Sequence, residues 1–309
     1  MGVPQGSLLG PLLYLCYCND IEIATKCKVI LYADDSLIIY NDKDPRVIEN
    51  ILSTELQSVN QWLIENKLSL HPGKCEAILF ASKRKANENF CIKFNDINIV
   101  GSQSVKYLGT ILENDLSGKE CVNKLVKKAN AKLKFLYRYR SVLNKHTRKI
   151  LAMSLVQSQL DYASMAWYYG INVEHKHRLQ VTQNRIIRFI LDMHPREHVG
   201  QKECIKTGLL NVENRVAQLG LNIVHRIYYH GLPEYLEPFF IRLRDTHDHN
   251  TRGSHYNFKV PKTNSVILKT FTYNAIKLWN LIPDTIKVIE SYTNFKRSLK
   301  KHLLNSITI

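Results

Sequence analysis

The chain has 309 residues, of which 45% are hydrophobic and 23% charged, and this composition excludes wholesale disorder and a fibrous repeat. Lys and Arg exceed Asp and Glu by 16, but residues 1–80 have a balance of −4 and residues 81–309 one of +20. An excess of this size favours a polyanionic partner, most often nucleic acid. The alternative is a basic protein without such a partner.

The first elements predicted are a loop and a helix. Residues 2–18 begin with a polar stretch rich in Gly and Pro and continue into an apolar segment. Pro11 suits the first turn of a helix, with Ser7 or Gly10 before it. The apolar segment is shorter than the ~18 residues that a membrane-spanning helix requires, so we expect no membrane association.

A hairpin and a second helix are predicted next. Residues 28–40 form two apolar runs divided by Asp34 and Asp35, which predicts a β-hairpin with a polar tip. In residues 45–66 the apolar side chains recur every three or four positions. This spacing predicts an amphipathic helix that packs on a sheet.

Short strands follow. His71-Pro72-Gly73 predicts a turn, and strand-like segments are expected at 77–81, 90–94, 97–100 and 105–112, with Asn95-Asp96 as a further turn. The order of these elements predicts an α+β fold with an antiparallel sheet.

After Gly118 the sequence is typical of long helices. We expect helices at 119–143, 146–169, about 174–192, 212–230 and 293–304, with a loop around His247, His249 and Gly253. Residues 117–150 carry eleven basic side chains and one acidic one, Glu120. This stretch is either a surface that binds phosphates or a solvated helix face.

The cysteines and the N-terminus indicate the compartment. Seven scattered cysteines favour reduced thiols over disulfides or a zinc site, and the first residues lack the basic start of a signal peptide. We therefore expect an intracellular protein of the nucleus, the cytoplasm or both, which is not secreted. The run Lys83-Arg84-Lys85 is too short for a nuclear signal and is expected to be a solvated loop.

Two motifs carry a family resemblance. G-V-P-Q-G-S-L-L-G-P-L-L at 2–13, followed by Y-A-D-D at 32–35, resembles the reverse transcriptase palm of non-LTR (LINE-type, jockey-like) retrotransposons. N-K-L-S-L-H-P-G-K-C at 66–75 resembles the lysine motif of that family, and V-K-Y-L-G at 105–109 resembles its primer-grip hairpin. Further segments, such as S-L-V-Q-S-Q-L-D-Y-A-S-M-A-W at 154–167, extend the resemblance over almost the whole chain.

The resemblance implies an RNA-directed DNA polymerase with two Mg²⁺ ions. Carboxylates on a rigid support are suitable ligands for this ion, and the resemblance makes Asp34 the principal metal ligand and Asp35 its neighbour. Lys74 is a candidate general acid for the leaving pyrophosphate. The alternatives are that the Asp pair consists of ordinary turn residues and that Lys74 is an exposed side chain after a turn.

Other residues are implied to contact the substrates. The resemblance places Pro4, Gln5, Gly6 and Ser7 against the nascent base pair and template, and it makes Tyr107, Leu108 and Gly109 the primer grip. The alternatives are a loop before a helix capped by Ser7, and an ordinary strand end. The helices after residue 118 would contact the phosphate backbone of the duplex through Lys124, Lys127, Lys128, Lys132, Lys134, Arg138 and Arg140.

These inferences predict a partial palm at 1–115, a basic helical thumb at 116–170 and a mostly helical tail at 171–309. The expected partners are an RNA template, a DNA primer and deoxynucleotides. The family's third metal-binding carboxylate lies on a strand before the G-V-P-Q-G motif, so we expect an N-terminally truncated reverse transcriptase with an incomplete two-ion site. The alternative is a non-catalytic remnant that binds nucleic acid.

Overall fold

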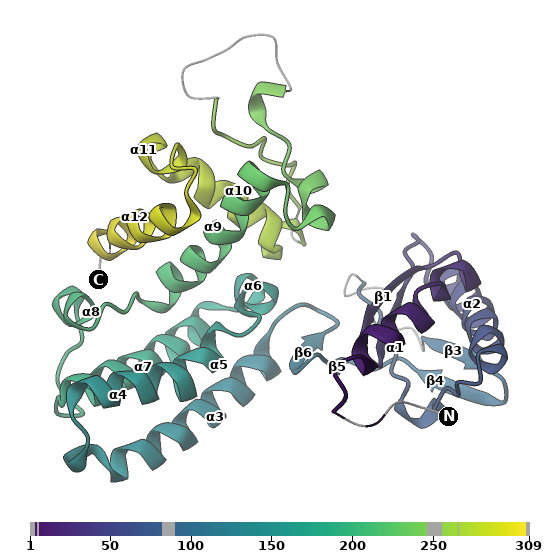
Figure 1. Cartoon of the computed structure of the whole chain (residues 1–309), viewed down its shortest axis with the longest axis horizontal. Helices are drawn as coiled ribbons and strands as arrows, with labels where there is room; N and C mark the ends of the chain where they lie inside the picture. Colours follow the sequence, from purple (N-terminus) through teal and green to yellow (C-terminus); the bar gives the residue numbers. More distant parts are fainter. Residues whose placement is uncertain (1–3, 5, 82–89, 246–254, 265, 307–309) are drawn as a thin grey trace. The chain divides into compact units, whose positions relative to one another are not determined.

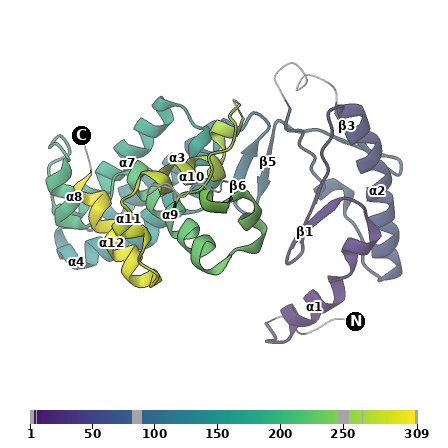
Figure 2. The ribbon, with the colours of Figure 1, turned by 90° about the horizontal axis from the view of Figure 1, so that it is seen from above.

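The computed structural model describes residues 4, 6–81, 90–245, 255–264 and 266–306. The chain divides into two compact units (Figures 1 and 2). The N-terminal unit comprises Met1–Lys106 and Glu113–Asp115, and the C-terminal unit comprises Tyr107–Leu112 and Leu116–Ile309. None of the helices in the described ranges combines the length and apolar character that a membrane-spanning helix needs.

The N-terminal unit mixes helices with two hairpins. Its elements in chain order are α1 (Gly10–Cys18), the 3₁₀ turn η1 (Ile21–Ala24), β1 (Lys28–Tyr32), β2 (Asp35–Ile39), α2 (Pro45–Glu65), the 3₁₀ turn η2 (Pro72–Lys74), β3 (Cys91–Phe94) and β4 (Ile97–Val100). The antiparallel pairs are β1–β2 and β3–β4, with Asn95 and Asp96 as the turn of the second. The predicted first helix, both hairpins and the amphipathic helix are confirmed.

Helix α2 connects the two hairpins through its buried face. It begins at Pro45, where the Asp44 carboxylate accepts a hydrogen bond from the Arg46 N–H group, as an N-cap residue should. Ile48, near its start, packs with the β3–β4 hairpin, whereas Val59, three turns later, packs with β1. One helix therefore supports the hairpin that carries the Asp pair.

The prediction of a strand at 77–81 is wrong. Within 77–81 only Ala77 forms a bridge, to Gly101, in which the Ala77 carbonyl accepts from the Ser102 N–H group at 2.8 Å. The strand-like segment 105–112 lies in a hairpin of β5 (Ser104–Tyr107) and β6 (Thr110–Glu113), as the resemblance to a primer-grip hairpin implied. The predicted antiparallel sheet is present, in the described residues, as three separate two-stranded sheets.

The C-terminal unit is mostly helical, and besides the β5–β6 turn it contains a bridge between Arg242 and Phe258. Its α-helices are α3 (Lys119–Arg138), α4 (Lys145–Ala152), α5 (Ser158–Asp161), α6 (Ser164–Trp167), α7 (Val173–Leu191), α8 (Gln201–Thr207), α9 (Val212–His230), α10 (Phe271–Leu281), α11 (Asp284–Lys287) and α12 (Tyr292–Asn305). Helices α3 to α7 enclose one apolar core, and α9, α10 and α12 enclose a second (Figure 1). The fold is therefore α+β, with a mixed N-terminal unit followed by a helical region.

Helix continuity was predicted less well than helix position. The expected helix 146–169 is broken, because Met153–Gln157 form a π-helix, Tyr162 is extended and Ala163 has a φ of +48°. The expected helix 119–143 ends at Arg138, and α8, α10 and α11 were not predicted. The loop with His247, His249 and Gly253, the run at 83–85 and Gln5 lie outside the described residues.

Candidate active site

The Asp pair lies at the tip of the β1–β2 hairpin. Tyr32 pairs with Asp35, which leaves Ala33 and Asp34 as a two-residue loop. Ala33 has a φ of +50°, the conformation that tight hairpin loops require. Both aspartates are exposed, so the hairpin holds two adjacent carboxylates on a short support that is open to solvent.

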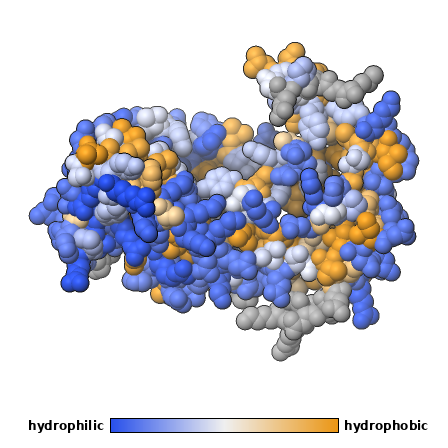
Figure 3. Space-filling model, turned by 90° about the horizontal axis from the view of Figure 1, so that it is seen from below, coloured by the Kyte–Doolittle hydropathy of each residue, from blue (hydrophilic) through white to orange (hydrophobic). Residues whose placement is uncertain are grey.

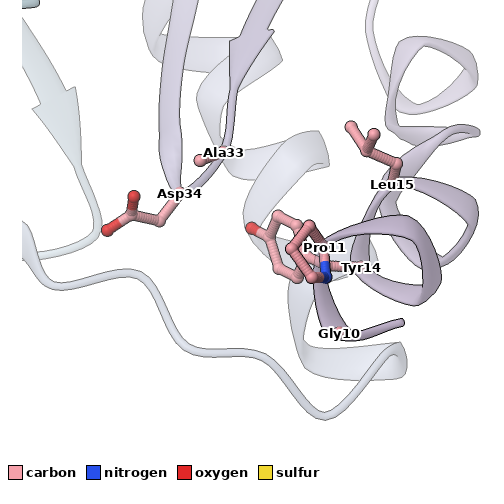
Figure 4. Close-up of a pocket in the computed structure, with 6 residues that line it drawn as sticks. All are labelled: Gly10, Pro11, Tyr14, Leu15, Ala33 and Asp34. Carbon is pink, nitrogen blue, oxygen red and sulfur yellow. The ribbon is translucent and has the colours of Figure 1, made fainter. Parts of the chain in front are cut away.

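A shallow pocket of about 410 Å³ lies between this tip and helix α1. Its lining is mostly apolar and consists of Gly10, Pro11, Tyr14, Leu15, Ala33 and Asp34 (Figure 4). The Tyr14 hydroxyl points toward the hairpin, and the Asp34 carboxylate extends away from the helix. Burial raises the pKa of Tyr14 to about 12, and the nearby Cys18 thiol and Asp34 carboxylate act in the same direction. Tyr14 is therefore a neutral phenol beside the Asp pair.

The loop before α1 is shaped by a turn and a side-chain hydrogen bond. The Ser7 N–H group donates to the Pro4 carbonyl at 3.1 Å, and the Ser7 hydroxyl accepts from the Gly10 N–H group at 3.0 Å. Gly6 has a φ of +87°, which favours glycine. The N-cap residue of α1 is Leu9 and not Ser7, although the Ser7 hydroxyl accepts from the first N–H group of the helix. Template contact by Pro4, Gln5, Gly6 and Ser7 stays a prediction.

Lys74 ends the 3₁₀ turn η2 and is exposed. It belongs to the same unit as the Asp pair, but no interaction between Lys74 and either carboxylate occurs among the described residues. Its role as a general acid stays a prediction.

The predicted primer grip forms the β5–β6 turn. Leu108 and Gly109 both have positive φ, of +44° and +81°. The hydroxyl of Tyr162 donates to the Leu108 carbonyl at 2.6 Å, and the Tyr162 ring lies 3.6 Å from where a Cβ atom at Gly109 would be. Tyr162, which the sequence reasoning did not single out, thus fixes this turn from the segment that follows α5.

Helix α3 carries most of the predicted phosphate contacts. Five of these side chains are exposed on it, namely Lys127, Lys128, Lys132, Lys134 and Arg138. Lys124 is half-buried. Arg140, beyond the helix, is also half-buried, forms an ion pair with Asp192 and donates to the Met193 carbonyl at 3.1 Å. The exposed set is therefore better placed for a polyanion than Arg140.

The donor set at the hairpin tip suits one Mg²⁺ ion. This ion is commonly bound by one or two carboxylates and completes its shell with water and phosphate oxygens. No group of three or more His, Cys, Asp or Glu side chains with metal-binding geometry occurs in the described part of the chain. Asp34 and Asp35 are thus suitable ligands, and two ions would need further oxygens.

Comparison with known proteins defines the class. Residues 1–112 match the family described as reverse transcriptase (RNA-dependent DNA polymerase). The segment that carries the Asp–Asp hairpin and its pocket is therefore a reverse transcriptase domain.

Relatives narrow the class further. The chain is 24% identical over 197 residues to a probable RNA-directed DNA polymerase from transposon X-element of Drosophila melanogaster, a match covering 61% of this chain and 21% of the relative. It is 26% identical over 203 residues to the RNA-directed DNA polymerase from mobile element jockey of Drosophila funebris, covering 61% and 22%. These relatives are RNA-directed DNA polymerases of non-LTR retrotransposons, and the chain is similar to them over about three fifths of its length.

A third relative shows what share of these longer proteins the chain covers. The chain is 28% identical over 210 residues to a probable RNA-directed DNA polymerase from transposon BS of Drosophila melanogaster, covering 62% of this chain and 22% of the relative. The chain thus spans about a fifth of the length of these relatives. No solved structure matches.

Proposed function

We propose that this chain takes part in RNA-directed DNA polymerisation and that Asp34 and Asp35 bind the divalent metal of that reaction. The observation that carries the proposal is a pair of adjacent exposed carboxylates beside a pocket, with Asp34 in the two-residue hairpin loop and Asp35 at the start of β2. When bound, Mg²⁺ would stabilise the entering and leaving oxygens of the phosphoryl transfer. The hairpin positions its two ligands, and α2 holds the hairpin from behind through Val59.

The other residues of the proposal position nucleic acid and nucleotide. Tyr14 and Pro11 give the pocket an apolar wall against which a base can stack. Pro4, Gln5, Gly6 and Ser7 precede that wall in the chain and are proposed to contact the template. Lys74 is proposed as the proton donor to the leaving group. The proposed template and primer are RNA and DNA.

The C-terminal unit is proposed to grip the duplex. Residues 116–170 are proposed as the thumb, because the exposed cations of α3 face solvent along a helix about 30 Å long. Tyr107, Leu108 and Gly109 are proposed to contact the primer, because Tyr162 holds their turn in one conformation. Residues 171–309 are proposed as the helical tail.

Metal binding tests the central residues without requiring activity. We expect Mn²⁺, followed by electron paramagnetic resonance, to bind the wild-type chain and to bind Asp34→Asn much more weakly. Asp96→Asn is the matched control, because Asp96 is an exposed aspartate at the turn of the other hairpin, β3–β4. Equal Mn²⁺ binding by wild type, Asp34→Asn and Asp35→Asn would contradict the proposal.

A second candidate function is nucleic-acid binding without catalysis. It is favoured by the basic surface of α3 together with the absence, in the described ranges, of a cluster of three metal ligands. Primer extension on an RNA template with Mg²⁺ separates the two. Extension that is lost in Asp34→Asn supports polymerisation by this chain, whereas duplex binding without extension supports the second candidate. Failure to bind the duplex would contradict both.

A further inference from the structure

Helices α3 and α7 are joined by a ladder of polar contacts. Arg178 donates to the Asn123 side-chain oxygen at 2.6 Å, and Arg185 donates to that of Asn130 at 2.9 Å. From the first pair to the second, the residue number increases by seven in each helix. The two helices therefore run in the same direction where they are in contact, and we call this line of contact the α3–α7 seam. The Tyr137 hydroxyl extends the ladder by donating to the Arg185 carbonyl at 3.2 Å.

The partner of each arginine is neutral. An amide oxygen orients a guanidinium group but does not cancel its charge. Two other arginines of the C-terminal unit are paired with carboxylates: Arg148 with Asp192 at 3.0 Å, and Arg215 with Asp161 at 2.7 Å. Among the described residues, Arg178 and Arg185 have no acidic partner within salt-bridge distance.

Cations of α3 lie along the same seam. Lys127 and Lys134 follow Asn123 and Asn130 by four residues, which places them beside the ladder on the α3 surface. Both are exposed, as are Arg138 and Arg185, while Arg178 is half-buried. Each helix has one acidic residue, Glu120 in α3 and Glu174 in α7. Figure 3, which views the molecule from the side where α3 lies in Figure 1, shows a largely hydrophilic surface over the helices.

We propose that this α3–α7 seam is a phosphate-binding track for a nucleic-acid backbone, in which Arg178 and Arg185 are fixed, uncompensated anion contacts. Seven residues of helix rise about 10.5 Å, which equals about three nucleotide steps at ~3.4 Å per strand. The planar guanidinium donors that the asparagines leave available are suited to phosphate oxygens. The inference rests on the proposed function, which it deepens by assigning α7, outside the proposed thumb, to duplex binding.

The test is a salt-dependent titration of the full chain with a fluorescently labelled RNA–DNA duplex. Each lost phosphate contact lowers the slope of log K against log salt by about 0.9. The double variant Arg178→Gln/Arg185→Gln should therefore reduce the slope by about 1.8, weaken binding about 60-fold at ~0.1 M salt and approach wild type near 1 M. Arg297→Gln is the matched control, because Arg297 is exposed on α12, away from the seam.

A second variant removes the positioning but keeps the charge. Asn123→Ala/Asn130→Ala should leave the salt slope unchanged and weaken binding by about threefold per arginine, because each guanidinium must then be ordered on binding. Circular dichroism checks that each variant is folded. Since the two pairs of substitutions change different residues, misfolding of one pair leaves the other as a test.

The outcomes separate this proposal from the proposed function. If wild type binds the duplex and the arginine double variant matches Arg297→Gln in slope and affinity, the seam proposal is overturned while the proposed function stands. If wild type does not bind the duplex, both are overturned. Binding to phosphatidylserine vesicles without binding to the duplex would reassign the seam to an anionic membrane surface and would also overturn the proposal.

Discussion

The substitution Gly109→Ala tests the conformation of the proposed primer-grip turn. Gly109 has a φ of +81°, and a Cβ atom there would lie 3.6 Å from Cε1 and 3.8 Å from the hydroxyl oxygen of Tyr162, which is ordinary van der Waals contact. The expected loss therefore comes from backbone conformation and not from a clash. A non-glycine residue in this region loses about 1–2 kcal/mol.

Thermal unfolding measures this loss. For a domain of about 200 residues, each kcal/mol shifts Tm by about 2–4 °C, so Gly109→Ala should lower Tm by roughly 2–8 °C if the turn unfolds with its unit. Gly109→Asn is the matched variant, because Asn adopts positive φ more readily than Ala, and it should lose less. An alanine variant as stable as wild type, or an asparagine variant less stable than alanine, would refute the reasoning.

The same turn is expected to depend on Tyr162. Tyr162→Phe removes the hydrogen bond to the Leu108 carbonyl, which is worth about 0.5–1.5 kcal/mol. The lower end applies, because Tyr162 is 54% exposed and water can reach the carbonyl. Urea unfolding of Gly109→Ala, Tyr162→Phe and the double variant should show non-additive effects, since the two residues are in contact. Strict additivity would contradict a joint role in holding the turn.

Two further predictions concern the packing of each unit. Trp279→Ala should lower the free energy of unfolding by about 3–5 kcal/mol, because the ring is fully buried and its N–H group donates to the Tyr256 carbonyl at 2.7 Å. Chemical denaturation measures this loss. A loss below ~1 kcal/mol would be inconsistent with a buried tryptophan in that core. Glu55 accepts hydrogen bonds from the Lys26 N–H group and the Thr25 hydroxyl, both at 2.7 Å, and they lower its carboxyl pKa. The ionised Glu55 carboxylate should therefore stabilise the fold at a pH above its pKa in the unfolded chain, and this stabilisation is lost as the pH falls through its lower pKa in the folded chain. Glu55→Gln should thus lower Tm at neutral pH but not in acid. A difference in Tm between wild type and variant that does not change with pH would be evidence against this linkage.

The hairpin with the Asp pair was predictable because its signals are local. The apolar runs around Asp34 and Asp35 are each about one strand long, which predicts a hairpin, although the two-residue loop falls one position earlier than the Asp pair, on Ala33 and Asp34. The amphipathic period of α2 is equally local. Such patterns predict where an element lies from its own residues.

The errors arose where a distant segment decides the conformation. Ala77 makes a single bridge, to Gly101, and the residues that follow it do not continue the pairing. The break at Tyr162 and Ala163 interrupts an otherwise helical period, and it places the Tyr162 hydroxyl on the Leu108 carbonyl, 54 residues earlier. Neither contact has a signal in the local sequence.

The candidate site was predictable in part for the same reason. The exposed lysines of α3 are evident from composition, whereas the arginines of α7 acquire their significance only when Asn123 and Asn130 are seen to hold them. The asparagines in α3 and the arginines in α7 are each seven residues apart in the sequence. This equal spacing indicates paired contacts only once the two helices are known to pack side by side in the same direction. Side-chain partners across helices were thus the information that the sequence lacked.

The most direct test of the account is metal-directed cleavage of the complex between this chain and an RNA–DNA template–primer. Fe²⁺ in place of Mg²⁺, with a reductant and peroxide, cuts whatever lies next to the bound ion. The account predicts that the chain is cut around residues 33–36 and the DNA primer near its 3′ end, and that both cuts disappear in Asp34→Asn but not in Asp96→Asn. Cuts elsewhere in the chain, or unchanged cuts in Asp34→Asn, would contradict a metal site at this hairpin.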